Sequence, residues 1–371
     1  MASSPLPVRE RHGERTSALR RELTVLPAER ILARRLTAQL LAGSPARDPL
    51  AVTERLLAIQ GQDPRGARLA IRARTRGVTA ADVDRELTEQ RSLLITWLHR
   101  GTLHLVASED YSWLHALTTP PLMTSSLTRL AQVGINPSEA RRGVTVIERA
   151  LAHEGPLTRL ELRERLDRAG LPTEGQALIH LLYRAALEGI TVRGPMIGRE
   201  HAYVLVSDWL PRPPPFERDR ALAELARRYL AGHGPAGERD LARWAGLSLR
   251  DARAGLGAIA PLLDQRPDGL LDLVGRPRAA RLPAPRLLGA FEPLLLGWRS
   301  REQVLGELEP TLVSGGVFRS FALVRGRAVA GWRFAGGGVQ LDPRAALSDA
   351  DSAALRADAE AVLEFLGGPR P

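Results

Sequence analysis

The sequence repeats one pattern at a fixed spacing. The segments "GPLTRLEL" and "GPAGERDL" begin at residues 155 and 234, and both have a leucine at the same place, Leu162 and Leu241. In each copy a helix is expected before the Gly-Pro pair, and two helices and two short strands are expected after it. Three helices and a two-stranded wing form the winged variant of the helix-turn-helix. The repeat therefore predicts tandem winged-helix units and a mainly helical chain.

The copies differ in clarity. In the clearest, residues 144–210, Thr158 and Glu161 have the spacing of a capping box, and "ITVRG" and "HAYVLV" are predicted strands. The next copy, residues 218–274, ends in "LLDQRPDGLLDLV", whose Asp-Gly pair favours a hairpin turn. A looser copy, residues 27–120, ends in "LLITWLHRGTLHLV" with an Arg-Gly turn. We expect three such units.

After residue 282 the pattern changes to strands. The segments "PRLLGAFEPLLLGW", "VFRSFALVRGRAVAGWRF" and "GGVQL" favour a small β-barrel or curled sheet, followed by a helix from about Ser348 to Leu366. The predicted fold class is α+β, mainly α, with three tandem winged-helix motifs and then a small β-barrel. The predicted divisions are a flexible basic tail at 1–26, winged helices at 27–143, 144–215 and 216–282, and the barrel with its C-terminal helix at 283–371.

Charge and composition limit the possible chemistry. The net charge is +10, with a pI near 11.1, which favours a polyanionic partner and nucleic acid ahead of a membrane surface. The sequence contains no lysine, which excludes a Schiff-base lysine and a P-loop lysine. It contains no cysteine, which excludes disulfides, thiolate zinc sites and iron-sulfur clusters. We expect no metal and no cofactor.

Hydropathy predicts the compartment. No run of residues is long and apolar enough for a membrane-spanning helix, and the N-terminus has no apolar signal-peptide core. We therefore expect a cytoplasmic protein that does not bind membranes.

The stretch "LLAIQGQDPRG", residues 56–66, contains two glutamines around a glycine. On a regular helix, residues two apart point roughly 200° apart, so Gln60 and Gln62 could not serve one site. Gly61 is a poor helix former, and Pro64 disfavours the helical conformation of Asp63, so we expect the chain to open here. In an extended segment, side chains two apart lie on the same side. The two amides can then converge on one target, although an ordinary surface role is the alternative.

Six segments follow one another along the chain: "LLAIQGQDPRGARLAIRAR", "TWLHRGTLHLV", "DWLP", "GPAGERDLARWAGL", "FEPLLLGWRSR" and "GGVFRSFALVRGRAVAGWR". Together they resemble the AlkZ-like family of bacterial winged-helix DNA glycosylases. The resemblance covers residues 27 to about 345 and implies a C-shaped arrangement of three winged helices and a barrel around the DNA duplex. It also implies that Gln60 and Gln62 form a catalytic Gln-x-Gln motif.

The chain departs from the family pattern at three positions. Gly61 stands at the middle of the motif, where a larger aliphatic residue is usual. In the barrel, Glu292 stands where aspartate is expected, and Ser320 stands where proline is common. The first departure concerns catalysis, and the other two concern turns of the barrel.

Two neutral amides are sufficient for one kind of glycosidic hydrolysis. An N7-alkylated purine is cationic, so the base leaves without protonation by an acid. The remaining work is to hold a water near C1′ and to favour the oxocarbenium-like sugar, which requires positioning and electrostatics. An undamaged nucleoside would need a strong general base or paired carboxylates, and the sequence has no such pair at a credible spacing.

Further candidates lie on the first wing and in basic segments. Arg100, Thr102 and His104 are secondary catalytic or DNA-binding candidates, and the last two share a strand face if the hairpin is regular. A structural wing with a surface histidine is the alternative. Four more arginines are predicted DNA-binding residues: Arg65, Arg299, Arg301 and Arg319.

The sequence thus predicts a DNA glycosylase that excises N7-alkylated purines, with bulky adducts or interstrand cross-links from a genotoxic metabolite as the expected lesions. Water is the expected nucleophile, and no lyase activity is expected because lysine is absent. The expected partner is double-stranded DNA, and we expect a monomer at the bacterial nucleoid. The alternative is a non-enzymatic winged-helix regulator of transcription, and winged helices also serve as protein-binding modules.

Overall fold

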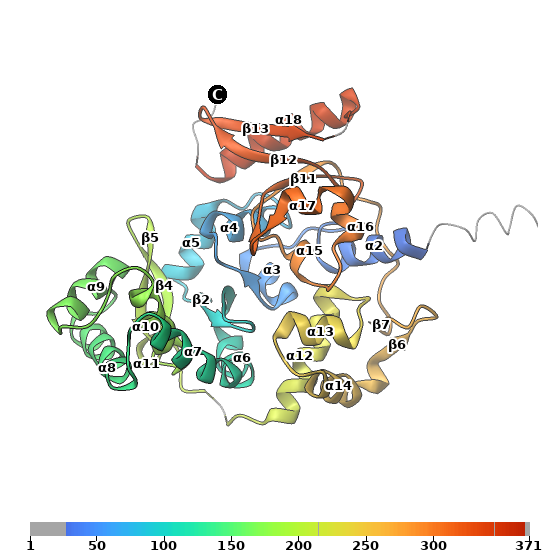
Figure 1. Ribbon diagram of the computed structural model, residues 1–371. Coiled ribbons are helices and arrows are strands. Elements are labelled where there is room, and N and C mark those ends of the chain that lie inside the picture. The colour runs from blue at the N-terminus through green and yellow to red at the C-terminus, as the bar shows by residue number, and fades with distance from the viewer. Residues whose placement is uncertain (1–26, 214, 345, 368–371) are drawn as a thin grey trace, which may run out of the picture.

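The computed structural model describes residues 27–213, 215–344 and 346–367. The tail predicted at residues 1–26 lies outside the described residues. The described chain is α+β and mainly helical, as predicted. Figure 1 shows a blue N-terminal part at the centre, with a green part and a yellow part on either side of it and an orange and red C-terminal part above.

Three segments, which we call the first, second and third units, share one order of elements. In each, a helix is followed by a strand or single β-bridge, two helices and a hairpin. The first unit comprises α3 (Pro49–Leu56), β1 (Ile59–Gln60), α4 (Pro64–Arg72), α5 (Ala80–Thr88), β2 (Leu93–Leu98) and β3 (Thr102–Ala107). The second comprises α8 (Pro137–Glu154), α9 (Arg159–Arg168), α10 (Ala177–Leu187), β4 (Thr191–Ile197) and β5 (Glu200–Leu205). The third comprises α12 (Arg218–His233), α13 (Glu238–Ala245), α14 (Leu249–Ala258), β6 (Leu263–Gln265) and β7 (Leu271–Leu273).

The predicted local features of the units are present. The capping box of Thr158 and Glu161 forms at the start of α9. The three predicted hairpins also form, and Gly101 and Gly269 have positive φ angles of 79° and 77° at the turns of the first and third.

The remaining elements of this part lie before, between or within the units. The helix α2 (Pro27–Ala38) precedes the first unit, and η2 (Ala260–Leu262) lies within the third. The others follow the first or the second unit: η1 (Ser108–Asp110), α6 (Tyr111–Thr118), α7 (Pro120–Gln132) and α11 (Val206–Trp209).

The hairpins of the first two units belong to one sheet. Its strand order is β1-β3-β2-β4-β5, and the two hairpins meet where Ile95 of β2 pairs with Arg193 of β4. The first strand, β1, pairs antiparallel with β3, so residues just after α3 lie beside the first hairpin. The third unit keeps its own two-stranded hairpin. In the ribbon, β2 and β4 lie between the blue and green parts of the chain (Figure 1).

The C-terminal part contains an antiparallel sheet in the order β13-β12-β11-β8. A turn at Arg325-Gly326 joins β11 and β12, and the predicted last helix runs over Asp349–Phe365. Its elements are β8 (Arg286–Leu288), α15 (Pro293–Leu296), α16 (Glu302–Leu305), η3 (Gly306–Leu308), α17 (Glu309–Leu312), β9 (Val313–Ser314), β10 (Val317–Phe318), β11 (Phe321–Val324), β12 (Arg327–Ala335), β13 (Gly338–Pro343) and α18 (Asp349–Phe365).

Two predictions for this part need correction. The strand pairings of the described residues form an open sheet and not a closed barrel, because α18 and α4 pack against β8 in place of a strand. The segment "PRLLGAFEPLLLGW" is only partly a strand, and its second half forms the short helix α15. Glu292 caps this helix by accepting a hydrogen bond from the Leu294 N–H at 3.2 Å, and Pro293 takes the first helical position.

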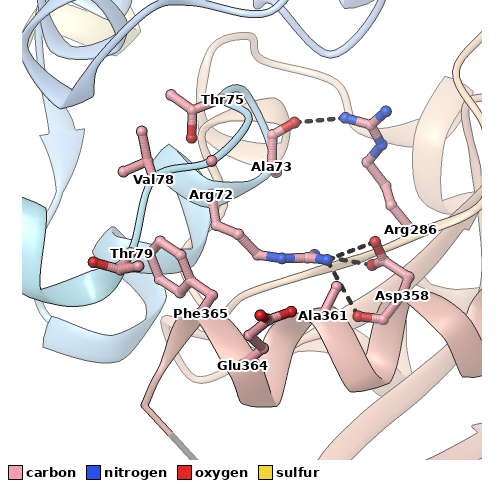
Figure 2. A pocket seen from close by; sticks show the side chains of 11 residues that line it. Arg72, Ala73, Thr75, Val78, Thr79, Arg286, Asp358, Ala361, Glu364 and Phe365 are labelled. Carbon is pink, nitrogen blue, oxygen red and sulfur yellow. Dashed lines mark hydrogen bonds and ion pairs between the residues drawn. The ribbon is translucent and has the colours of Figure 1, made fainter.

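The C-terminal part fixes the position of α4. Arg72 forms an ion pair with Asp358 of α18, with Nη–O distances of 2.7 and 2.9 Å, and Arg286 donates a hydrogen bond to the Ala73 carbonyl at 2.5 Å. Figure 2 shows both contacts at the cleft between the end of α4 and α18. Arg74 and Glu292, both fully buried, form a further ion pair at 2.5 Å. No helix in the described ranges is long and apolar enough to cross a membrane.

Candidate active site

Gln62 lies in an extension that the other units do not have, and Gln60 directly precedes it at the end of β1. In the second unit the bridging residue Leu157 directly precedes the helix cap Thr158, and Ala236 and Gly237 do the same in the third. In the first unit, Gly61 and Gln62 separate the last strand residue, Gln60, from the helix cap Asp63. The extension therefore lengthens the connection between β1 and α4 by two residues, of which Gly61 is buried and Gln62 is exposed.

The local sequence explains why the chain opens at this point. Leu57 ends α3 with a positive φ of 64°, and Asp63 begins α4 by accepting a hydrogen bond from the Gly66 N–H at 2.6 Å. Pro64 takes the first position of α4, where its missing N–H costs nothing. Between them, the Gly61 N–H donates to the Leu103 carbonyl at 2.7 Å. The predicted open segment is confirmed, and Asp63 at its end is the cap of α4.

The glutamines differ in exposure. Gln60 is 7% exposed and pairs with His104 across the sheet, whereas Gln62 lies in a bend after the strand and is exposed. Within the described residues, neither amide forms a hydrogen bond with another group. The Gln60 amide atoms are not among the enclosed polar atoms of the described residues that lack a partner, so they keep access to water. The Gln60 amide can therefore hydrogen-bond to a water or to a ligand that reaches it.

His104 lies beside Gln60 on one face of the sheet. The register places Gln60, His104 and Thr96 in one row across β1, β3 and β2. The His104 Nδ1 lies 2.9 Å from the Thr102 carbonyl oxygen, and burial lowers the pKa of His104 well below 6.5, with His99 and Arg100 lowering it further. Its imidazole is thus neutral at physiological pH, which leaves it able to orient a hydrogen bond but unsuited to acid catalysis.

A group of aromatic rings lies next to His104. The His99 ring is 4.7 Å from the His104 ring and 4.6 Å from the Trp244 ring of the third unit. Burial lowers the pKa of His99 to about 3, with Arg100 adding to the shift. The sequence analysis missed His99 and Trp244, because no local pattern brings together residues so far apart in the chain.

Arg100, at the tip of the first hairpin, packs on the third unit. Its Nη1 donates to the Arg243 carbonyl at 2.9 Å and also to the Trp244 carbonyl, at the C-terminal end of α13. A cation is favourable there because the last carbonyls of a helix carry partial negative charge. Burial and the nearby charges of Arg243 and Arg301 lower the pKa of Arg100. Arg100 therefore joins the first and third units and is also part of a cationic group.

The predicted DNA-binding arginines differ in their surroundings. Arg65 is exposed one position after Pro64, and its Cζ lies 4.6 Å from the Phe334 ring centre. Arg299 and Arg319 are exposed on the C-terminal part. Arg301 is engaged within the protein, since it pairs with Glu309 at 3.3 Å and donates to the Leu295 carbonyl at 2.8 Å. Of the four, Arg65 lies closest to the glutamines in the chain.

Thr102 faces the same side of β3 as His104, as predicted for a regular hairpin. Its hydroxyl is buried and lacks a hydrogen-bond partner within the described residues, as does the Thr96 hydroxyl. No group of three or more His, Asp or Glu side chains in the described chain is arranged to hold a metal ion. The groups at Gln60 are therefore neutral amides, hydroxyls and imidazoles.

Comparisons with known proteins agree with this description. The model of a family described as DNA glycosylase AlkZ-like matches residues 53–365. An interstrand DNA cross-link repair glycosylase of Streptomyces sahachiroi is 29% identical over 285 residues, which is 68% of this chain and 72% of that protein. The solved structure of the Streptomyces sahachiroi DNA glycosylase AlkZ is similar with a TM-score of 0.72 and 22% identity, and the match covers 92% of this chain and 97% of that one.

Proposed function

Because the chain belongs to the AlkZ-like DNA glycosylase family, we propose that it hydrolyses the N-glycosidic bond of N7-alkylated purines in double-stranded DNA. Bulky adducts and interstrand cross-links are the lesions we propose, and the similarity to the interstrand DNA cross-link repair glycosylase of Streptomyces sahachiroi supports the second of these. In this proposal the three units are winged helices that, with the C-terminal sheet, surround the duplex in a C shape. The protein acts as a monomer.

The observation that carries the proposal is the Gln60 amide, which forms no hydrogen bond within the described residues, keeps access to water and lies next to a neutral imidazole. A cationic N7-alkylpurine needs no acid to leave. In this mechanism Gln60 and the exposed Gln62 hold the attacking water and the sugar, and they stabilise the positive charge that develops on the sugar. His104 orients Gln60 from the neighbouring strand, and Arg65 contacts a phosphate.

Replacing the glutamines tests this proposal. Gln60→Ala and Gln62→Ala should each slow base release from N7-methylguanine DNA by about 10-fold or more, which corresponds to about 1.4 kcal/mol per factor of ten. DNA affinity should stay nearly unchanged, because phosphate contacts supply most of it. The matched control is Gln132→Ala, since this glutamine is exposed at the end of α7.

Two results would contradict the assignment. Equal rates in the wild type and in both glutamine variants would exclude the two amides from catalysis. Sequence-selective binding without release of any base would favour a non-enzymatic regulator of transcription.

A further inference from the structure

A cleft of about 460 Å³ lies between α9, the hairpin of β4 and β5, and the start of α4. Its lining is strongly cationic. Glu200 is the carboxylate among the lining residues, and the arginines that line it are Arg159, Arg163, Arg193 and Arg199.

Arg193 is held in place by aromatic rings. Its Cζ lies 4.7 Å from the ring centre of Trp97 and 4.7 Å from that of Tyr203. Its Nε is buried without an acceptor, and no carboxylate of the described chain lies within ion-pair distance. Stacking fixes the guanidinium plane without neutralising its charge. The free edge of Arg193 is thus preorganised for an anion.

Two more arginines of the cleft lack a carboxylate partner within the described residues. Arg159 is exposed at the first position of α9, and Arg199 is exposed at the turn of the hairpin. Arg163 differs, because it lies 3.7 Å from Asp167 and also pairs with Glu174. The cleft therefore has three uncompensated guanidinium groups.

The cleft adjoins the glutamine extension. Pro64, two residues after Gln62, lines it. The hairpin is attached to α4 because Arg68 Nη1 lies 3.5 Å from His201 Nε2 and Arg68 Nη2 lies 3.6 Å from Met196 Sδ. These contacts keep the cationic cleft next to the site where the sugar would bind.

We propose that this cleft binds the phosphodiester backbone beside the alkylated nucleotide and thereby positions that nucleotide at Gln60 and Gln62. This inference rests on the proposed function. Guanidinium groups match phosphate oxygens in geometry and charge, and three of them with one carboxylate leave a net positive site. Arg193, Arg199 and Arg159 are positioning residues that contact the strand and not the reacting bond.

Arginine substitutions and neutral phosphates test the proposal together. Arg193→Gln, Arg199→Gln and Arg159→Gln are compared with Arg168→Gln, which changes a 69% exposed arginine at the other end of α9. The ligand is DNA with one 2′-fluoro-N7-methylguanosine, whose fluorine prevents base loss, and single methylphosphonates are placed on either side of it. Each cleft variant should reduce the slope of log affinity against log salt by about 0.9, and the control should not change it.

The methylphosphonates identify the contact. At one or two positions beside the lesion, a neutral phosphate should weaken binding of the wild type several-fold but cause no further loss in the matching cleft variant. Additive losses at every position, or unchanged salt slopes, would overturn the proposal. Arg159 and Arg199 are exposed, so their variants decide the matter even if Arg193→Gln does not fold.

The proposed function can fail separately from this inference. One result would support the cleft and reject the glycosylase activity: a neutral phosphate weakens binding of the wild type but not of the matching cleft variant, while N7-methylguanine DNA without fluorine or methylphosphonate releases no base. Normal base release, with the same effect of each neutral phosphate on the wild type and the variants, would support the glycosylase activity and reject the cleft.

Discussion

Gly61 and Gly66 lie on either side of Gln62, and the structure gives them opposite roles. A Cβ at Gly61 would meet its nearest neighbours at 3.6 Å, an ordinary contact distance, and Gly61 does not have a positive φ. A Cβ at Gly66 would lie 2.3 Å from the Ala290 carbonyl oxygen. The backbone of α4 therefore needs glycine at 66, whereas the glycine inside the motif is not required for space.

These two glycines give a matched pair of variants. Gly61→Ala should stabilise the protein by about 0.4–1 kcal/mol, because alanine restricts the unfolded chain at a compatible backbone position. Gly66→Ala should destabilise it by about 1–3 kcal/mol through overpacking. Urea denaturation measures both changes. A destabilised Gly61→Ala or an unchanged Gly66→Ala would contradict the contacts described here.

The element on which the proposed site depends is α4. Its N-terminal turn follows Gln62 and packs on Ala290, and its C-terminal end is tied to α18 through Arg72 and Asp358. Asp358 also accepts a hydrogen bond from the Leu287 N–H at 2.6 Å, so it joins α4, α18 and β8. The last helix of the chain thus supports the helix that follows the motif, which gives the C-terminal part a role in placing Gln62.

Removing the charge of Asp358 tests this link. Asp358→Asn leaves Arg72 largely buried without a counter-ion, since the two side chains are 19% and 12% exposed, and should cost about 3 kcal/mol of unfolding free energy. The control is Asp342→Asn, because its ion pair with Arg344 is exposed and is expected to contribute about 0–1 kcal/mol. Equal effects of the two substitutions in urea denaturation would show that α18 does not hold α4.

Across the whole molecule, buried histidines make the fold sensitive to acid. Burial lowers the pKa of His99, His201 and His233 to about 3, and nearby arginines add to the shift for each. The unfolded chain binds protons on these groups below about pH 6.5, and the folded chain does not until near pH 3. Above pH 6.5 these histidines are neutral in both states and do not lower the free energy of unfolding. Below pH 6.5 the unfolded chain gains protons that the folded chain does not, so the free energy of unfolding falls.

The expected loss is about 1.4 kcal/mol per histidine for each pH unit below 6.5. Urea denaturation at pH 7.5 and pH 5.5 should therefore give clearly different free energies of unfolding. A flat dependence over this range would mean that the histidines become protonated in the folded protein.

The absence of lysine also makes a prediction for the whole chain. Without an amine to form a Schiff base with the exposed sugar, base release should leave an intact strand with an abasic site. After reaction with N7-alkylguanine DNA, strand cleavage should appear only in the portion treated with hot alkali, and borohydride should trap no covalent complex. Cleavage before alkali, or a trapped complex, would implicate the N-terminal amine or another group and would reject water as the nucleophile.

The sequence by itself determined most of the local structure. The capping box of Thr158 and Glu161, the open segment before Asp63, the last helix from about Ser348 and the hairpin turns were predicted from residues close together in the chain. This succeeds because capping and turn formation depend on hydrogen bonds between near neighbours. The sequence left the choice between a small barrel and a curled sheet open, because closure depends on pairing between distant strands, and it did not predict α15.

Some features of the candidate site were predictable from the sequence, and others arise only in the tertiary structure. The spacing of Gln60 and Gln62 and the likeness of the surrounding segments to a known family marked the motif from sequence. Only the tertiary structure buried Gln60 beside His104, placed His99 against Trp244 and stacked Arg193 between Trp97 and Tyr203. Burial, lowered pKa values and unpaired cations arise from contacts between residues far apart in the chain, and no local pattern encodes them.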